Sequence, residues 1–432
     1  MALTLLVLLG SFFLLMAINV PISIAIGFAT LLTMLLSIDF GPAVVTIAQR
    51  MAGGINSFAL LAIPFFILSG LLMGRGGIAY RLIEFAKVLL GRLPGGLAFV
   101  NVISCALFGS ISGSAVACTS AIGGFMLPTM AKEGYDKNFS GALTVTASAA
   151  GMLIPPSNIL IVYSLASGGV SIAALFVGGY LPGFLTLFAL MVVVGIFAKI
   201  KGFPAGEPVP FRAGIKKTID AIPSLLLVIV VIGGIIGGYF TATEASVIAV
   251  LYSMLLAMVL YRAVSIRDLP GILLKAVEIT AIVMLLIGTS SAMSWMLSYE
   301  NIPQAISEGL IGLSDNPYVI MMTINLIVLV VGLFMDMTPA VLIFTPIFLP
   351  VVTEMGMSPL HFGMILILNL SISLCTPPVG SILFVGCTIA KTSIQHMIRP
   401  LLPMYLAMFI VLMLVTYIPA ISEFLPRYFG LY

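Results

Sequence analysis

Small hydroxyl residues interrupt an otherwise apolar stretch in the run GSISGS, where Ser110, Ser112 and Ser114 surround Gly113. Hydroxyl oxygens, together with the carbonyls that a broken helix releases, are ligands that a hard cation such as sodium prefers. Small residues of this kind also allow close contact between membrane helices, and the run alone favours neither interpretation. A similar break later in the chain favours the cation site.

A second break in the apolar sequence is the pair Pro155-Pro156, which Ser157 and Asn158 follow directly. Proline has no backbone N–H, so the carbonyls before the pair lose their helical partners. Those carbonyls, with the Ser157 hydroxyl and the Asn158 amide, can coordinate a cation. The alternative is that the prolines only kink the helix. We expect this break and the serine run to form one site.

The second half of the chain offers a related pair of breaks. Asp336 and Thr338 stand before Pro339, and the segment 376–380 reads TPPVG. An acidic residue at membrane depth is costly and by default marks a functional site. The alternative is that Asp336 caps a helix that begins at Pro339. Both roles are compatible, because one carboxylate oxygen can cap the helix while the other faces an ion.

The two pairs of breaks are related by an internal duplication with an offset of 222 residues. This offset superimposes Leu127-Pro128 on Leu349-Pro350. It also relates Pro155-Pro156 to Pro377-Pro378, Gly141 to Gly363, and Ser171-Ile172 to Ser393-Ile394. Four matches at one offset, two of them dipeptides that contain proline, predict two homologous halves.

The composition places these breaks in a membrane protein. Of 432 residues, 61% are hydrophobic and only 8% are charged, which is too few charges for a water-exposed surface. Long unbroken apolar runs such as 181–197 exclude a β-barrel, so the predicted fold is an all-α polytopic membrane protein in a lipid bilayer. A net charge of +3 does not indicate a nucleic-acid partner, and the four cysteines lack metal-ligand spacing.

The apolar runs predict about ten spanning helices, two of them broken, and two re-entrant helical hairpins. The hairpins are expected at 95–131 and 316–353, and the broken helices at 138–167 and 360–390. Amphipathic segments are expected at 79–91 and 266–278. Repeats of opposite topology with broken helices are the architecture of a secondary transporter, in which unwound backbone lines the binding site.

Basic residues orient this arrangement. If the two hairpins insert from opposite sides, 16 of the 18 Lys and Arg residues fall on one side and Arg50 and Arg427 on the other. The positive-inside rule makes the rich side cytoplasmic and places both termini in the periplasm. Two full spans in place of either hairpin would preserve this count, so charge predicts the orientation and does not prove re-entrance.

The sequence does not predict an enzyme. An intramembrane serine protease needs a histidine at depth, whereas His361 and His396 each stand at the end of a span. An intramembrane aspartyl protease needs two acids at depth, and Asp336 stands alone. The sequence contains no P-loop, so the chain is not expected to use ATP.

Together, several of these motifs resemble the large membrane subunit, of the DctM or SiaM type, of tripartite ATP-independent periplasmic (TRAP) transporters. The resemblance covers essentially the whole chain, and its motifs are specific only as a set. They are LPGGLA at 93–98, GSISGSAVA at 109–117, AAGMLIPPSN at 149–158, FMDMTPAVLIFTPIFLPV at 334–351 and TPPVG at 376–380.

The resemblance implies a large permease subunit of the bacterial inner membrane that takes up an organic acid, sialic acid or a C4-dicarboxylate, by sodium symport. Its partners would be a small four-helix membrane subunit and a periplasmic substrate-binding protein. Transport would follow an elevator mechanism, in which a transport domain moves against a scaffold. The expected boundaries are 1–92 (scaffold and first arm), 93–172 (first transport half), 173–315 (scaffold and second arm), 316–395 (second transport half) and 396–432 (final scaffold helix).

The resemblance also implies two or more bound sodium ions. The first site would fall on Ser110, Ser112, Ser114, Pro155, Ser157 and Asn158. The second would fall on Asp336, Thr338, Thr376 and Gly380. The substrate contacts are not identified; without an arginine at membrane depth, helix N-termini, hydroxyls or bound sodium would have to hold a carboxylate.

Two other functions remain open at this point. A single-component sodium–dicarboxylate symporter of related repeat architecture would need no partner, so co-purification with a small helical subunit distinguishes it. An ion channel would need a continuous pore between the hairpin tips and would show flux far above the turnover of a carrier.

Overall fold

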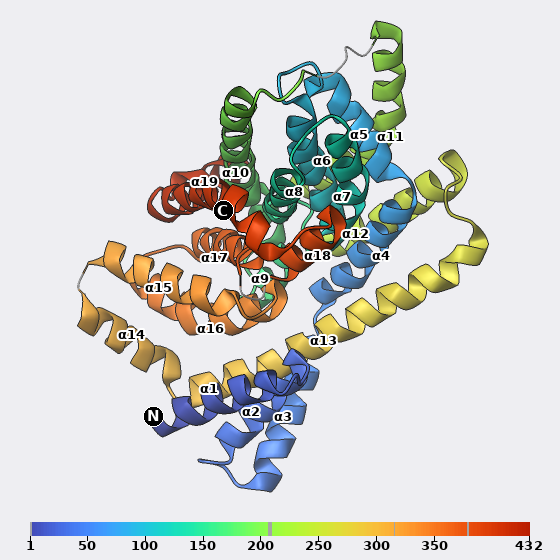
Figure 1. Ribbon diagram of the computed structural model, residues 1–432. Coiled ribbons are helices and arrows are strands. Elements are labelled where there is room, and N and C mark those ends of the chain that lie inside the picture. Colours follow the sequence, from blue (N-terminus) through green and yellow to red (C-terminus); the bar gives the residue numbers. More distant parts are fainter. Residues whose placement is uncertain (1, 206–209, 315, 378–379) are drawn as a thin grey trace.

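The chain folds into helices that are joined by short turns (Figure 1). The computed structural model describes residues 2–205, 210–314, 316–377 and 380–432, and within these ranges the only strand pairing is a bridge between Pro94 and Ala205. Seven of the described helices are long and apolar enough to cross a membrane. The predicted all-α polytopic membrane fold is confirmed.

The helices fall into two halves and a short C-terminal helix. The first half comprises α1 (Ala2–Ala17), α2 (Ile22–Met34), α3 (Phe40–Ile55), α4 (Ala62–Arg75), α5 (Ile78–Leu90), α6 (Gly96–Ser112), α7 (Ala115–Lys132), α8 (Lys137–Gly151), α9 (Asn158–Ala166) and α10 (Ile172–Lys201). The second comprises α11 (Phe211–Ile236), α12 (Ala242–Met254), α13 (Leu269–Tyr299), α14 (Ile302–Leu313), α15 (Pro317–Gly332), α16 (Met337–Glu354), α17 (Pro359–Leu374), α18 (Ser381–Ala390) and α19 (Ile394–Tyr417). The C-terminal helix is α20 (Ala420–Tyr428).

The duplication extends to the helix boundaries. α7 spans 115–132 and α16 spans 337–354, so both of their boundaries differ by 222. α10 and α19 begin at 172 and 394, which gives the same difference. Each half therefore contains one helical hairpin, α6–α7 or α15–α16, and one interrupted helix, α8–α9 or α17–α18.

One expected element of the second half needs correction. The segment 266–278 is not a separate amphipathic arm, because it continues from a 3₁₀ turn at Ile266–Asp268 into the long helix α13. No glycine or proline stands between 272 and 287, so nothing in the sequence interrupts the helix there. By the offset, the counterpart of α5 is α14, a helix that the sequence analysis did not predict.

The inner body, defined here as α6–α10 and α15–α20, contains both hairpins and both interrupted helices (Figure 1). α8 and α17 form its core, and every residue at 139–151 and 360–374 is buried. The two halves interlock, because α7 packs against α18 while α16 packs against α9. Small residues allow close packing: a Cβ on Gly151 would lie 2.7 Å from the Cys105 carbonyl oxygen.

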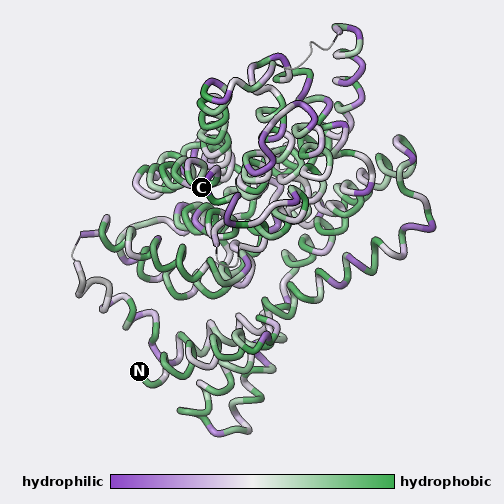
Figure 2. The backbone as a smooth tube through the Cα atoms, viewed as in Figure 1, coloured by the Kyte–Doolittle hydropathy of each residue, from purple (hydrophilic) through white to green (hydrophobic). Residues whose placement is uncertain are grey.

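The outer helices, α1–α4 and α11–α13, pack mainly on one another. α4 packs against α12, and α13 packs against α2 and α3. α5 contacts both α11 and α6, and α14 contacts both α13 and α16, so both helices join the outer helices to the inner body. α13 also packs directly against α16, and α4 against α6. Figure 2 shows hydrophobic residues along the long helices and hydrophilic residues mainly at helix ends and connections, as contact with lipid requires.

α10 and α19 lie in the inner body, whereas the boundaries read from the sequence placed them with the scaffold. Both helices pack against α8 and α17. The contact of α10 is close, because a Cβ on Gly179 would lie 2.4 Å from the Leu153 carbonyl oxygen. Long apolar helices do not reveal from sequence alone which of their faces meets protein and which meets lipid.

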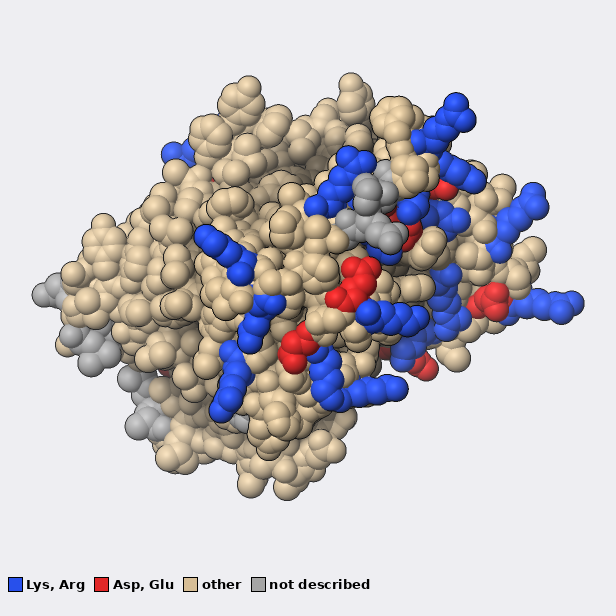
Figure 3. Space-filling view, turned by 45° about the horizontal axis from the view of Figure 1, so that its top comes forward, with Lys and Arg blue, Asp and Glu red and all other residues tan. Residues whose placement is uncertain are grey.

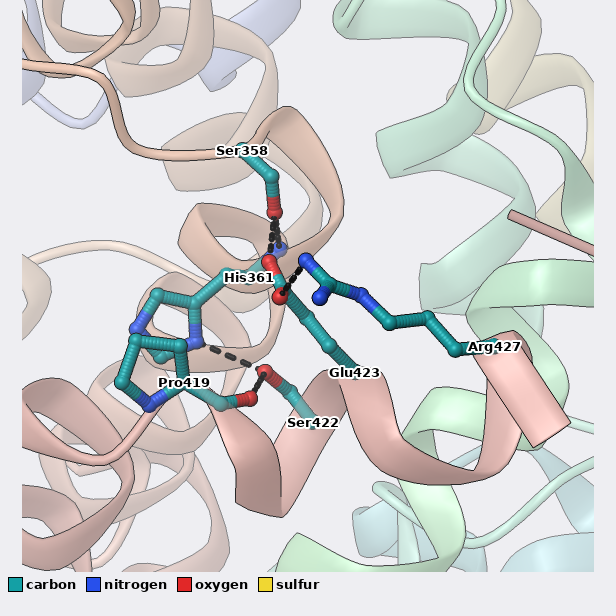
Figure 4. Close-up of polar contacts among 6 residues, drawn as sticks. All are labelled: Ser358, His361, Pro419, Ser422, Glu423 and Arg427. Carbon is teal, nitrogen blue, oxygen red and sulfur yellow. Dashed lines mark hydrogen bonds and ion pairs between the residues drawn. The ribbon is translucent and has the colours of Figure 1, made fainter.

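The short helix α20 is tied to the first turn of α17 (Figure 4). Glu423 accepts a hydrogen bond from Ser358 and pairs with Arg427 at 2.6 Å. His361, which is buried, contacts the Ser422 hydroxyl through Nδ1 at 2.7 Å. These contacts attach the end of the chain to the inner body rather than to the outer helices.

Candidate ion and substrate site

The serine run forms the tip of the first hairpin. α6 ends at Ser112, Gly113 turns the chain with a φ of 60°, and Ser114 caps α7 by accepting a hydrogen bond from the Ala117 N–H at 3.3 Å. Glycine suits this left-handed conformation because it has no Cβ. A Cβ at Gly113 would also lie 2.7 Å from Asn158 Nδ2, so the tip contacts the start of α9. The structure thus brings two of the predicted site segments together.

The first interruption separates α8 from α9 at 152–157, and its Pro155 is buried. Ser157 has no exposed surface, and its hydroxyl has no hydrogen-bond partner among the described residues. A buried hydroxyl without a partner is unfavourable by about 1–3 kcal/mol, so a water or an ion would stabilise it, as it would other such buried hydroxyls, for example those of Thr119 and Thr345. An oxygen with free lone pairs at this position fits a cation.

The tip serines are also able to act as cation ligands. The Ser110 hydroxyl donates to the Leu107 carbonyl at 2.9 Å, and the Ser112 hydroxyl donates to the Ser114 carbonyl at 3.4 Å. Each hydroxyl directs its single hydrogen at a carbonyl, so its lone pairs stay available to a cation. Both serines are buried, which protects such an ion from water.

In the second hairpin, Asp336 caps α16. Its carboxylate accepts a hydrogen bond from the Met337 N–H at 2.9 Å, and Thr338 follows in the first turn. The capping role that the sequence suggested is confirmed, although the helix begins at Met337 rather than at Pro339. Asp336 occupies the position that corresponds to Ser114, because 336 − 114 = 222. The residue is partly exposed, although protein atoms crowd its carboxyl, and within the described residues only one carboxylate oxygen accepts a hydrogen bond.

The second interruption separates α17 from α18 at 375–380, of which Pro378 and Val379 lie outside the described residues. Thr376 donates to the Ile372 carbonyl at 2.8 Å. A Cβ on Gly380 would lie 2.8 Å from the Thr376 carbonyl oxygen. Within the described ranges no hydrogen bond joins Asp336 to Thr376 or Gly380, so the structure does not bring the second predicted set together by direct contact.

Two residues near the second interruption were missed by the sequence analysis. The Ser381 hydroxyl is buried without a hydrogen-bond partner in the described part of the chain, as Ser157 is in the first half. Its position directly after TPPVG was a usable signal. The Tyr405 hydroxyl on α19 donates to the Cys375 carbonyl. Nothing in the sequence around Tyr405 indicated this contact.

Four helix N-termini lie at these tips and interruptions, at the starts of α7, α9, α16 and α18. The segments around them, at 110–114, 152–158, 333–338 and 374–381, contain no lysine or arginine. A helix N-terminus carries a partial positive charge and free N–H groups, which bind anions. The site can therefore offer hydroxyls and carbonyls to cations and helix N-termini to a carboxylate.

An outer helix touches the first tip. A Cβ on Gly70 of α4 would lie 2.9 Å from the Ser112 carbonyl oxygen. Glycine at this position lets the backbone of α4 approach the tip closely. The candidate site thus lies where the inner body meets the outer helices.

Charged residues cluster away from these apolar segments, and Figure 3 shows many lysines and arginines on one face of the molecule. Charged contacts also hold α5 to the outer helices. Glu84 pairs with Lys217 of α11 at 2.7 Å and with Lys87 at 3.0 Å. Burial raises the pKa of the Glu84 carboxyl, but the hydrogen bonds from Lys217 and Lys87 outweigh burial and leave the pKa below its usual value.

Known proteins resemble the chain in sequence and in fold. Residues 9–421 match the family model of the tripartite ATP-independent periplasmic transporter, DctM component. The uncharacterized protein YgiK of Salmonella typhimurium is 51% identical over 424 residues, which cover 98% of this chain and 97% of that protein. The C4-dicarboxylate TRAP transporter large permease protein DctM of Pseudomonas aeruginosa is 38% identical over 408 residues, 94% of this chain and 95% of that protein.

A solved structure shows the same fold. The YdaH transporter of Alcanivorax borkumensis superimposes with a TM-score of 0.63 over 88% of this chain and 89% of that chain, at 14% sequence identity. The family match covers nearly the whole chain, and the matched range includes both hairpin tips and both interruptions. The chain therefore belongs to the DctM family of TRAP transporter large permeases.

Proposed function

We propose that the chain is the permease subunit of a sodium-coupled importer of an organic acid in the bacterial inner membrane. The observation that carries the sodium coupling is the buried Ser157 hydroxyl, which has no partner among the described residues and stands beside the first hairpin tip. Sodium moving down its gradient supplies about 2.3 kcal/mol per charge per 100 mV, in addition to its concentration term. Two or more ions per cycle would therefore concentrate an anion strongly.

The first sodium site in this proposal consists of the tip and the first interruption. Hydroxyls of Ser110, Ser112 and Ser157, the Asn158 side chain and released carbonyls would supply oxygen ligands. The contact between Gly113 and Asn158 supports the proposal, because it shows that the two segments meet. Ser114 already caps α7 and Pro155 can offer only its carbonyl, so their contributions would be secondary.

The second sodium site would use the Asp336 carboxylate, Thr338, and oxygens of Thr376 and Gly380, to which we add the Ser381 hydroxyl. Asp336 supplies the negative charge that the first site lacks. The site requires Asp336 to approach the second interruption when sodium binds, because no described hydrogen bond joins them. We propose that such closure accompanies sodium binding.

The substrate class follows from the chemistry of the helix N-termini and from the relatives. Helix N-termini without a neighbouring lysine or arginine suit a carboxylate that is balanced by bound sodium. The Pseudomonas aeruginosa relative is named for C4-dicarboxylates. We propose an organic acid, a C4-dicarboxylate or a sialic acid, as the transported molecule.

Transport would proceed by an elevator movement of the inner body against the outer helices. The interlocked halves hold the inner body together, and it meets the outer helices through α5 and α14 and through direct contacts of α13 with α16 and of α4 with α6. The Glu84–Lys217 pair at 2.7 Å would hold α5 to α11 during the movement. In this proposal α10 and α19 move with the hairpins, which changes the boundaries inferred from the sequence.

The remaining parts of the proposal concern orientation and partners. The positive-inside rule would place the basic side in the cytoplasm and both termini in the periplasm. A component of a tripartite system would work with a small membrane subunit and a periplasmic substrate-binding protein. α1–α3 and α13, which lie outside the inner body, are available for the small subunit.

The experiment that tests this function is uptake into proteoliposomes that contain the chain and its small subunit. Uptake of a labelled organic acid is measured with and without an inward sodium gradient and with and without the periplasmic binding protein. A requirement for both supports the proposal. A requirement for sodium alone indicates a single-component symporter, and uptake without either at channel-like rates contradicts carrier function.

A further inference from the structure

α19 reaches the second interruption through the side chain of Tyr405. The Tyr405 hydroxyl donates a hydrogen bond to the Cys375 carbonyl, whereas the neighbouring Thr376 hydroxyl donates to the Ile372 carbonyl at 2.8 Å. Cys375 is the first residue after α17, and Thr376 belongs to the proposed second sodium site. One tyrosine on a neighbouring helix therefore holds the backbone of the interruption directly before Thr376.

The hydrogen bond from Tyr405 lies among backbone carbonyls that have lost their helical donors at the end of α17. Pro377 and Pro378 have no backbone N–H, so carbonyls in the last turn of the helix lose their usual donors. A Cβ on Gly380 would lie 2.8 Å from the Thr376 carbonyl oxygen and 3.1 Å from that of Leu374. These two carbonyl oxygens lie close to Gly380. The carbonyl of Cys375, which stands between them in sequence, accepts the hydrogen bond from Tyr405. Among the described residues, the Cys375 carbonyl thus has a donor, whereas no backbone N–H donates to the Leu374 or Thr376 carbonyl.

The corresponding position in the first half is occupied differently. Subtraction of 222 from 405 gives Gly183 of α10, where a Cβ would lie 2.8 Å from the Ile154 side chain. In the first half, α10 therefore packs directly on the interruption and needs no long side chain. In the second half, Tyr405 fills the space between α19 and the interruption, and its hydroxyl provides a bond that the first half lacks.

We propose that Tyr405 is a positioning residue for the second sodium site. Its hydroxyl holds the Cys375 carbonyl, and thereby fixes the backbone of the interruption and the direction of the Leu374 and Thr376 carbonyls on either side. This inference rests on the proposed sodium coupling. Tyr405 itself does not touch the ion; it acts through residues 375 and 376.

Tyr405→Phe tests the proposal, because it removes the hydroxyl and keeps the ring. The matched control is Tyr163→Phe: the buried Tyr163 hydroxyl also donates to a backbone carbonyl, that of Pro359, at the other end of α17. Both variants are reconstituted with the small subunit, and uptake of the organic acid is measured as a function of sodium concentration.

Loss of one hydrogen bond that orients the ligands is expected to raise the half-saturating sodium concentration of Tyr405→Phe by about five- to tenfold. The maximal rate at saturating sodium should stay close to that of the wild type. Tyr163→Phe should leave the half-saturating sodium concentration unchanged. A lower maximal rate with unchanged sodium dependence, or equal shifts in both variants, would overturn the positioning role.

Two further readouts keep the outcomes distinct. A wild-type protein without sodium dependence refutes the proposed function itself, whereas a sodium-dependent wild type with unaltered Tyr405→Phe refutes only the role of Tyr405. If the variant does not fold, hydrogen–deuterium exchange of the wild type is the test. Sodium should then slow exchange both at 374–384 and in the turn around Tyr405, and protection of 374–384 alone contradicts the inference.

Discussion

Substitution of Ser157 by alanine distinguishes a serine that binds sodium from one that only stabilises the fold, because the two roles predict different effects of sodium on the stability of the variant. The Ser157 hydroxyl is fully buried and lacks a hydrogen-bond partner among the described residues. In the absence of sodium, its removal relieves an unsatisfied group, so the free energy of unfolding should stay the same or rise. Sodium should stabilise the variant less than it stabilises the wild type, because one oxygen that binds the ion has been removed.

The size of the sodium effect can be estimated. An interaction between a hydroxyl and a charged partner contributes about 1.5–3 kcal/mol, so the sodium Kd of Ser157→Ala should rise by at least about tenfold. A ligand at 100 times its Kd stabilises a protein by about 2.7 kcal/mol, and at ten times its Kd by about 1.4 kcal/mol. The sodium-induced stabilisation should therefore fall by about 1.3 kcal/mol or more.

The assay is thermal unfolding of the purified protein in detergent, with sodium replaced by choline at constant ionic strength. Ser140→Ala is the control, because Ser140 is equally buried in α8 but donates to the Asp136 carbonyl at 3.0 Å, far from the tip. It should retain the full sodium-induced shift. An unchanged sodium-induced shift in Ser157→Ala would refute the ligand role, whatever its effect on stability without sodium.

Three further substitutions test other parts of the account. Asp336→Asn keeps an oxygen that can cap α16 but removes the charge, so the complex should assemble while sodium-driven uptake falls at least about tenfold; uptake at the wild-type rate would exclude Asp336 as a ligand. Gly113→Ala forces a side chain into a backbone with φ of 60° and toward Asn158, so we expect a loss of about 1–2 kcal/mol in stability and weaker sodium binding, measured by the same unfolding assay. Glu84→Gln should lower stability by about 0.2–1 kcal/mol at neutral pH. Because the folded-state pKa of Glu84 is depressed, its contribution is present above the usual value of 4.5 and is lost as the pH falls through the folded pKa, so the difference between wild type and variant should vanish in acid.

Much of the fold followed from the sequence because the relevant signals are local. At the first tip and at the two interruptions, glycine, serine and proline break apolar runs and helices end there, although prolines such as Pro128 and Pro182 stand inside helices. The offset of 222 carried the boundaries of α7 onto those of α16, although few residues are identical between the halves. The same local signals located the first tip and both interruptions of the candidate site.

The parts that the sequence did not reveal depend on packing between distant helices. α10 and α19 are apolar around most of their surface, so hydropathy did not show that both pack on α8 and α17. The amphipathic character of 266–278 suggested an arm, whereas no glycine or proline stands between 272 and 287, so α13 continues past the end of this segment. Tyr405 was missed because its contact with the Cys375 carbonyl exists only in the folded chain, whereas Ser381 could have been found from its position directly after TPPVG.

The measurement that tests the central claim most directly is the simultaneous flux of sodium and substrate. Proteoliposomes that contain the chain and its small subunit receive ²²Na⁺ together with labelled organic acid and the periplasmic binding protein. The account predicts that the substrate drives ²²Na⁺ entry at a fixed ratio of more than one ion per molecule, and that Ser157→Ala requires more sodium to reach it. Substrate entry without accompanying ²²Na⁺ would contradict sodium coupling, and ²²Na⁺ entry that does not depend on substrate would contradict a symporter.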